Sequence, residues 1–480
     1  MEKPGLHAGR RWLQAAILAT GLVTGACVGV FGLMGQFFPM VIVFAGGLVY
    51  MIMRRPATGL FLGLLLSFFI SGLTRYLALP WGLGVDILLV LSILAVFFRD
   101  FKQINASLLR NDLFFLAALW MGYILLQIGN PESASITAWF YAMRGIGFYQ
   151  IMVFGLIMLL FRNARYLKIF MHTIIWLSIL GSLWGIKQKY IGLDYAEDHW
   201  LWALGHYDEH VLFGVLRVFS FYSDAGQFGA SQAMVALMCG ILLFDPGAGT
   251  KNKVFYAAGF LLTALGFAIS GTRGALAVPA LGGLAFLVTS RNFKILIAGL
   301  LAMMLTFGLL KYTHVGHGIE QVRRMRTALA PENPSLLARL KNQRTLAQYL
   351  RSRPLGGGVG SAGFWGERFS PNTLLAQTPT DSYYVKIWAE TGIIGVCLQA
   401  LILGYIVGRG ALIVLHTRNQ SLRFQGMAIF SAIVGVLFAS YGNQVFSQMP
   451  TGMIMSMGIA LLFLIPEYDK ALNESKKRIA

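Results

Sequence analysis

The chain has 480 residues, of which 56% are hydrophobic and only 12% are charged, and its mean hydropathy is +0.65. This composition excludes a water-soluble globular protein, so the sequence predicts an all-α, polytopic membrane protein built as a helical bundle. The net charge of +19 does not indicate a nucleic-acid partner, because Lys and Arg in membrane proteins mark the loops that stay in the cytoplasm.

Apolar runs long enough to form membrane helices recur along the whole chain. About 20 apolar residues in a helix cross a hydrocarbon core of about 30 Å. The sequence predicts about fourteen such spans, with both termini on the same side of the membrane. They are residues 12–34, 38–53, 57–74, 82–98, 113–129, 146–161, 167–186, 226–244, 254–270, 274–289, 295–310, 382–408, 424–446 and 449–465.

The distribution of cations predicts the orientation of these spans. Of the 39 Lys and Arg residues, 22 fall on alternate loops, which places both termini in the cytoplasm. The outward side then holds a loop over residues 187–225 and a large hydrophilic insert over residues 311–381. Residues 1–310 contain the first eleven spans, and residues 382–480 contain the last three spans and a cytoplasmic tail. The insert carries ten Lys or Arg and four Asp or Glu, but long loops cross the membrane regardless of charge.

Two short amphipathic helices are predicted in the insert. The first covers residues 318–329, and the second begins with Ser335 as its N-cap and ends before Pro354. Arg339 flanks the apolar face of the second helix and is expected to be partly buried, with Arg344 on the other flank. This face comprises Leu336, Leu340, Gln343, Ala347 and Leu350. The following Gly-Gly-Gly-Val-Gly run at 356–360 is either a flexible hinge or a backbone cradle for an anion.

Three arginines outside the predicted spans are candidates for anion binding. Arg217 precedes the eighth span, Arg273 lies in the tight Ser-Gly-Thr-Arg-Gly connection at 270–274, and Arg339 belongs to the insert. An arginine so close to hydrocarbon is costly unless it snorkels to the interface or pairs with an anion. Guanidinium groups bind phosphate bidentately and stay charged, so the three could converge on a lipid diphosphate.

Asp381 is the candidate proton acceptor. It lies where the insert re-enters the membrane, a position where partial desolvation is expected, and it could also serve as N-cap of the next helix. Alternative bases are the outward histidines, whose spacing does not indicate a zinc site, so we expect neither a metal nor a cofactor. They are His199, His206, His210, His314 and His317.

A few charged residues lie inside predicted spans. Lys386 and Glu390 are four residues apart and are expected to form an ion pair across one helical turn. Asp86 has no partner nearby in the sequence and could mark a polar cavity.

Three segments together resemble the O-antigen ligase and polymerase superfamily of bacterial membrane polysaccharide enzymes. The first runs from Arg217 to Phe228, and the second is the 270–274 connection continued by Ala275. The third joins Arg339, the glycine run, the Asp-Ser-Tyr-Tyr sequence at 381–384 and the Ala-Glu-Thr-Gly-Ile-Ile-Gly sequence at 389–395. Their order, spacing and placement around one outward loop match the family over roughly residues 210–400.

The resemblance implies a function in lipopolysaccharide or exopolysaccharide biosynthesis at the periplasmic face of the bacterial inner membrane. Members of the family transfer a glycan from an undecaprenyl diphosphate-linked donor. The acceptor is a lipid A-core sugar in ligases and another lipid-linked glycan in polymerases. The family's outward arginines bind the diphosphate, and the matching positions are Arg217, Arg273 and Arg339, with Arg344 as a further candidate. Inversion at the sugar is also implied, without a metal or nucleotide.

The sequence differs from the family at the position of the proposed catalytic base. Ligases have a His followed by Asn where this sequence has Asp381 and Ser382. A carboxylate can accept the same proton, but the difference favours a polymerase or a ligase with another acceptor over a lipid A-core ligase. Two other functions remain open: a flippase or transporter of lipid-linked or anionic glycans with Asp86, Lys386 and Glu390 along a polar path, and a non-enzymatic scaffold for envelope assembly.

Overall fold

The computed structural model describes residues 37–100, 109–212, 214–314 and 334–479, with isolated positions 21, 25, 29, 318, 322, 323 and 326. These residues belong to two compact units, residues 1–60 with 90–104 and residues 61–89 with 105–480. The predicted first span and the predicted short helix at 318–329 lie almost wholly outside the described residues. All the candidate site residues belong to the second unit.

Helices make up nearly all of the regular structure. Up to the outward loop they are α2 (Phe37–Arg54), α3 (Pro56–Tyr76), α4 (Trp81–Asp100), α5 (Asp112–Leu126), η4 (Gln127–Gly129), α6 (Ile136–Met143), η5 (Arg144–Phe148), α7 (Tyr149–Leu160) and α8 (Arg165–Tyr190). The loop over residues 187–225 adds α9 (Tyr195–Trp202), α10 (Tyr207–His210) and the strands β1 (Val211–Leu212) and β2 (Val215–Leu216). After it come α11 (Ala225–Leu242), α12 (Thr250–Ser270), η6 (Gly274–Leu276), η7 (Val278–Gly282), α13 (Gly283–Thr289) and α14 (Phe293–Tyr312). The C-terminal part contains α16 (Pro334–Leu350), α17 (Gly363–Phe369), α18 (Leu374–Gln377), α19 (Tyr383–His416), α20 (Gln420–Ala439) and α21 (Thr451–Ile479).

The prediction of a helical membrane protein is confirmed. Ten of the described helical segments are long and apolar enough to cross a membrane, and three shorter apolar segments accompany them. Each predicted span from the second to the fourteenth overlaps one of these segments. The apolar runs determine these helices, because a helix satisfies its own backbone hydrogen bonds where water is absent.

Three details differ from the prediction. The chain is not purely helical, because β1 and β2 form a small antiparallel hairpin that pairs Val211 with Leu216. Helix α19 continues to His416 and contains a kink at Gly392, where φ is 66°. Helix α20 ends at Ala439, so residues 440–450, which were predicted to lie mostly inside a span, form an irregular polar segment.

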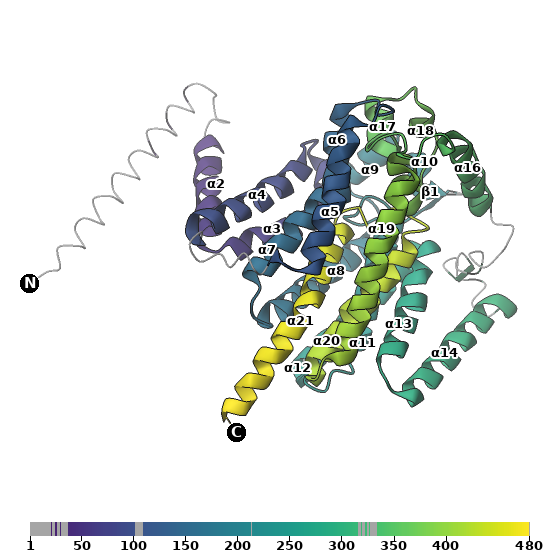
Figure 1. Cartoon of the computed structure of the whole chain (residues 1–480). Helices are drawn as coiled ribbons and strands as arrows, with labels where there is room; N and C mark the ends of the chain where they lie inside the picture. Colours follow the sequence, from purple (N-terminus) through teal and green to yellow (C-terminus); the bar gives the residue numbers. More distant parts are fainter. Residues whose placement is uncertain are drawn as a thin grey trace, which may run out of the picture. The chain divides into compact units, whose positions relative to one another are not determined.

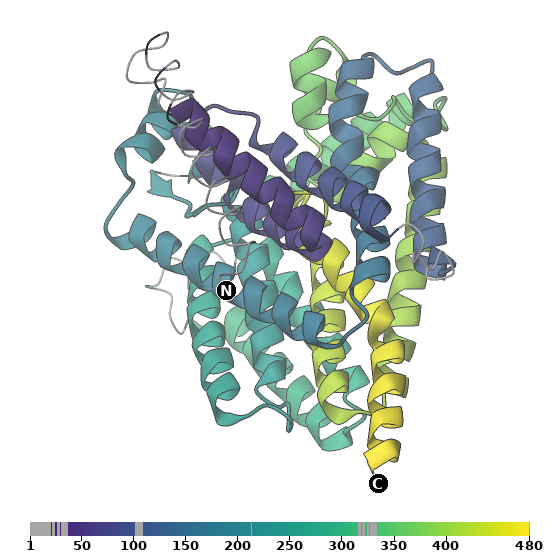
Figure 2. The same ribbon diagram turned by 90° about the vertical axis from the view of Figure 1, so that its left-hand side faces the viewer.

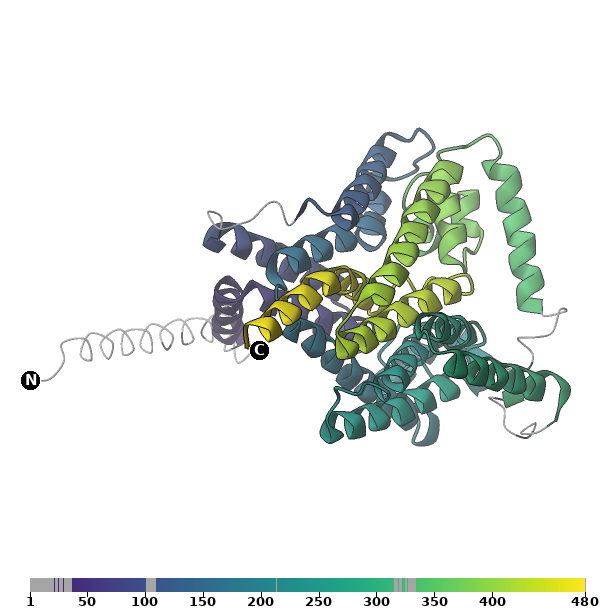
Figure 3. The same cartoon turned by 60° about the horizontal axis from the view of Figure 1, so that its bottom comes forward.

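The core of the second unit consists of α11, α20 and α21, which are the most buried of the candidate spans. Helix α11 packs on α12 and α20, and α20 packs on α19 and α21. Figure 2 shows α21, in yellow, running beside α19 and α20, and Figure 3 shows these three helices next to one another from a different angle. Small residues in α11 permit this close packing. For example, a Cβ atom on Gly229 would lie 2.4 Å from Ser270 Oγ.

The short elements gather at one end of the long helices. Figure 1 shows α9, α10, the hairpin, α16, α17 and α18 close to the N-terminal end of α19. These elements come from the two segments that the charge pattern predicted to face outward. The candidate site residues therefore lie at this end of the second unit.

Candidate active site

Arg217 directly follows the hairpin. Its backbone N–H donates to the carbonyl of His210 at 2.8 Å, and its side chain is half-buried. The next residues, Val218, Phe219 and Ser220, are fully buried. The segment that carries Arg217 is therefore fixed in the unit rather than free to move as a surface loop.

An arginine that the sequence did not single out, Arg75 at the end of α3, holds this segment in place. Its guanidinium is buried and donates to the backbone carbonyls of Ser220, at 2.5 Å, and Tyr222. It also lies over the rings of Trp200 and Phe219, 4.7 and 4.2 Å from their centroids. In the sequence, Arg75 lies at the end of an apolar run, where an arginine commonly extends its side chain to the membrane interface, so nothing marked it as a structural residue.

The connection that carries Arg273 lies against the start of α11. Gly271 ends α12 in the left-handed conformation. Thr272 Oγ1 then donates to the carbonyl of Ala225 at 2.7 Å. Arg273 follows at the start of η6, where its side chain is half-buried.

Helix α16 packs on the protein mainly through its C-terminal half. Leu346 and Leu350 are buried in a small apolar cluster whose other members are Ala362, Leu375 and Ala389. Of the predicted apolar face, Leu350 packs inside the protein, whereas Leu336, Leu340 and Ala347 are exposed. The reason is that the residues from 362 to 389 fold back over α16 and select which side of the helix is covered.

Arg339 shares the buried face of α16, seven residues before Leu346, and its half-buried position confirms the expectation. The neighbouring cations Lys341 and Arg344 are exposed. Arg339 Nε lies 3.4 Å from Asp381 Oδ2, and Nη2 donates to the carbonyl of Gly442 at 2.9 Å. Two of the predicted site residues are therefore in direct contact, whereas Arg344 is exposed on a different face.

Asp381 does not serve as the N-cap of α19. That position belongs to Ser382, and Asp381 directs its carboxylate toward Arg339 instead. Its side chain is 52% exposed, so the protein covers only about half of it. The exposed part of the carboxylate is accessible to a substrate.

Residues 440–444, named here the 440–444 turn, connect all four candidate segments. Gly442 accepts a hydrogen bond from Arg339, and a Cβ atom on it would lie 3.5 Å from the Cα of Gly274. Asn443 Nδ2 donates to Asp224, the N-cap of α11, at 3.1 Å. Gln444 Nε2 donates to the carbonyl of Thr380. The segments of Arg217, Arg273, Arg339 and Asp381 thus meet around one turn.

The region that holds this geometry matches a known family. Residues 258–400 match the family model described as O-antigen ligase. Residues 258–400 are therefore similar to an O-antigen ligase domain. The match bears out the resemblance to this superfamily and supports a membrane enzyme of the O-antigen ligase or polymerase type. A search of curated proteins found no match.

The O-antigen ligase domain contains Arg273, Arg339, Arg344 and Asp381, but Arg217 and the 440–444 turn lie outside the matched residues. The site is therefore assembled from the domain and from segments on both sides of it. Among the described residues, no group of three His, Cys, Asp or Glu comes together as a metal site would require.

The glycine run of the ligase domain is neither a hinge nor an open cradle. Residues 356–360 are all buried. A Cβ atom on Gly356 would lie 2.4 Å from the backbone nitrogen of Gly392, and one on Gly360 would lie 2.5 Å from the carbonyl of Ala138. The glycines are needed because this loop packs directly on the backbone of α19 and α6.

The predicted ion pair between Lys386 and Glu390 is not formed. Glu390 is fully buried beside the glycine run, and its carboxylate oxygens have no hydrogen-bond partner of regular geometry. Helical spacing brought the two residues into reach, but the packed loop separates the carboxylate from solvent.

Asp86 has a partner from a distant part of the sequence. Its Oδ2 lies 2.6 Å from Nη1 of Arg144 in η5, and both side chains are mostly buried. Such a pair satisfies the charges inside the bundle. Asp86 therefore has a structural partner.

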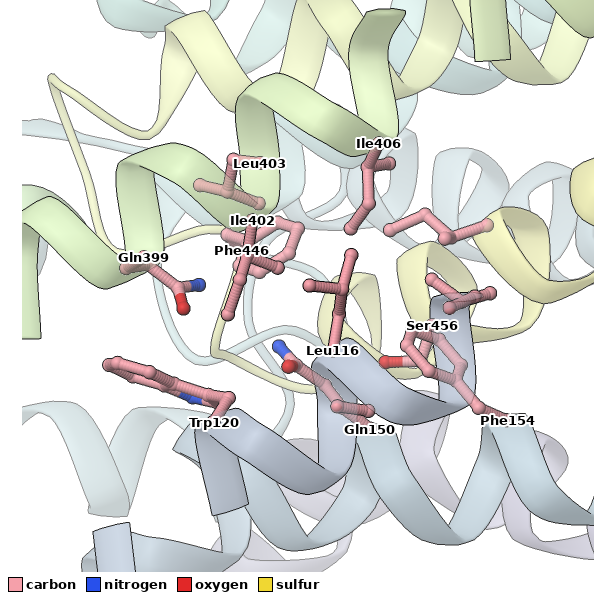
Figure 4. A pocket seen from close by; sticks show the side chains of 13 residues that line it. Leu116, Trp120, Gln150, Phe154, Gln399, Ile402, Leu403, Ile406, Phe446 and Ser456 are labelled. Atoms are coloured by element: carbon pink, nitrogen blue, oxygen red, sulfur yellow. The ribbon is translucent and has the colours of Figure 1, made fainter. Parts of the chain in front are cut away.

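A narrow pocket lies between α5, α7, α19 and α21 (Figure 4). Its lining is apolar apart from Gln150, Gln399 and Ser456, and Gln399 donates to the hydroxyl of Tyr383 at 2.9 Å. It contains no charged residue. Arg339 and Asp381 are therefore a better candidate for the catalytic site than this pocket.

Proposed function

We propose that the protein is a glycosyltransferase that moves a glycan from undecaprenyl diphosphate to an acceptor hydroxyl at the periplasmic face of the bacterial inner membrane. Both termini then lie in the cytoplasm, and residues 311–381 form the periplasmic loop, as the charge pattern predicts. The acceptor is a lipid A-core sugar or a second lipid-linked glycan. The reaction uses no metal, because arginines supply the positive charge.

The contact between Arg339 and Asp381 carries this proposal. It places a permanent cation beside an exposed carboxylate, inside an O-antigen ligase domain. A glycosyl transfer with a diphosphate leaving group needs both: positive charge for the departing anion and a base for the acceptor proton.

In the proposed reaction, the acceptor oxygen attacks the anomeric carbon of the donor sugar. The bond from that carbon to the diphosphate oxygen breaks, and its electron pair leaves with undecaprenyl diphosphate. The acceptor proton passes to the Asp381 carboxylate. Attack opposite to the leaving group inverts the anomeric centre.

The same contact suggests how donor binding prepares the base. Before the donor binds, Arg339 is shared between Asp381 and the Gly442 carbonyl. A diphosphate binds a guanidinium bidentately and would displace the carboxylate, which is the longer of these two contacts. Asp381 is then free to accept a proton, while Arg217, Arg273 and Arg344 supply further charge around the diphosphate.

Arginine variants test this proposal. Replacing Arg339 or Arg273 with Ala should abolish glycan transfer in purified protein supplied with lipid-linked donor and acceptor, while the variants still insert and fold. Lys341→Ala is the matched control for Arg339, because Lys341 is an exposed cation on the same helix. Normal transfer by a well-folded Arg339→Ala protein would contradict the proposal.

The same assay separates the enzyme from a transporter, because a transporter forms no glycosidic bond. The transporter hypothesis relied on Asp86, Lys386 and Glu390 as a polar path. The close pairing of Asp86 with Arg144 and the enclosure of Glu390 favour the enzyme. In cells, the glycan gel of a deletion strain distinguishes ligase from polymerase: loss of all chains indicates a ligase, and chains of one repeat indicate a polymerase.

A further inference from the structure

A second pocket lies at the far end of α19 from Asp381. It is formed between the last turns of α19 and the C-terminal half of α21 and has a volume of about 530 Å³. A helix rises about 1.5 Å per residue, so a pocket lined by residues 409–416 is separated from the start of α19 at Tyr383 by nearly the full length of the helix. It is therefore independent of the candidate active site.

The lining of this pocket is rich in cations. Arg409, Arg418 and Lys470 contribute permanent positive charges, and all three side chains are exposed to the pocket or its mouth. His416 adds an imidazole. An anion that entered would meet charge from α19, from the start of α20 and from α21.

The acidic residues of the lining offset these charges only in part. Asp469 is buried, and its two carboxylate oxygens accept the backbone N–H groups of Arg418 and Asn419 at 2.9 and 2.8 Å. It thus holds the connection between α19 and α20, just before Asn419, the N-cap of α20. Asp469 keeps its negative charge, so it and the exposed Glu474 together oppose the three permanent cations and leave the lining with a small positive excess.

Apolar surface lies directly beside the cations. On α19, Leu412 and Ile413 lie between Arg409 and His416 at the spacing of one helical face. Leu412 is 48% exposed, as the lipid-facing side of a candidate membrane span would be. A free inorganic anion would make no favourable contact with such a surface, whereas a phospholipid presents a phosphate and an acyl chain together.

We propose that this pocket binds the headgroup of an anionic membrane phospholipid, with the phosphate among Arg409, Arg418 and Lys470 and the acyl chain along Leu412. Basic pockets between membrane helices are suited to such headgroups, and each Lys or Arg near an anionic lipid surface contributes about 1 kcal/mol. The lipid would join the ends of α19 and α21, the two helices whose other ends flank the candidate active site.

Lipid binding to the full-length protein tests the proposal. Wild-type protein in neutral detergent should bind phosphatidylglycerol in preference to phosphatidylcholine, measured by native mass spectrometry and by the rise in melting temperature. The double variant Arg418→Gln with Lys470→Gln should weaken phosphatidylglycerol binding about tenfold to thirtyfold. The Gln at 418 keeps the backbone N–H that donates to Asp469, so the connection between α19 and α20 persists.

The control variant is Lys251→Gln with Lys253→Gln, which removes two exposed cations at the start of α12, outside the pocket. It should bind phosphatidylglycerol as wild type does. Equal binding of the two lipids, an equal loss in the control, or equal stabilisation by inorganic phosphate would each overturn the proposal. If the double variant folds poorly, Lys470→Gln alone should weaken binding about fivefold. Glycosyl transfer is not the readout, so this test is decided separately from the proposed activity.

Discussion

Replacing Asp381 with Asn separates catalysis from stability at the candidate site. The carboxylate is 52% exposed and lies 3.4 Å from Arg339 Nε. An exposed pair of this kind contributes about 0.2 to 1 kcal/mol to stability, and the Asn side chain keeps the shape. Loss of a general base, in contrast, lowers the rate by about 10² to 10⁴.

We therefore expect Asp381→Asn to melt within a few degrees of wild type and to transfer glycan at least about a hundredfold more slowly. The assay is a gel shift of the acceptor, with purified protein in nanodiscs and a saturating lipid-linked donor. Asp208→Asn is the control, because Asp208 is an exposed acid of the other outward segment. A rate within twofold of wild type would exclude Asp381 as the base and direct attention to the outward histidines.

Two further predictions concern stability. The pKa of His210 is lowered to about 4, because the side chain is buried and the Arg75 guanidinium lies nearby. An unfolded His titrates near 6.5, so between pH 6.5 and 4 only the unfolded state takes up this proton. The folded state is therefore destabilised as the pH decreases through this range. Wild type should lose about 2 kcal/mol between pH 7 and pH 5 through this group; His210→Gln should lose correspondingly less in thermal unfolding, and equal losses would contradict the assignment. Gly392→Ala should cost at least about 2 kcal/mol, because φ is 66° and the new Cβ would lie 2.0 Å from the Pro354 carbonyl oxygen. Gly404→Ala in the same helix, where nothing lies within 4 Å, should melt as wild type does.

The helices were predictable because their cause is local. A run of apolar residues of sufficient length has one stable arrangement in a membrane, and the overlap of thirteen predicted spans with described helices follows from that constraint. Helix ends were less predictable. Helix α19 continues past the predicted residue 408 to His416, because Arg409 is an exposed cation at the end of the span rather than an interruption of it.

The candidate site was predicted in its residue types but not in its contacts. Hydropathy and helical spacing indicated that Arg339 would be half-buried, and this is confirmed. Neither property indicated that Asp381 would turn away from the N-cap position to meet Arg339. Nor did they indicate that Glu390 would be enclosed by the glycine run instead of pairing with Lys386. These outcomes depend on residues 353–381 folding back on α16 and α19, which no local pattern encodes.

The 440–444 turn shows most directly why the site could not be read from the chain. Asn443 and Gln444 stand between apolar residues on both sides, so averaged hydropathy placed them inside a helix that continued to residue 446. The helix ends instead at Ala439, and the freed carbonyls of Ser440 and Gly442 accept hydrogen bonds from Tyr383 N and from Arg339. A backbone carbonyl is free to accept from an arginine in this way at the end of a helix or outside one, since in the helix interior it bonds to its own turn. The end of α20 is therefore decided by the same partners that form the site, and neither can be derived without the other.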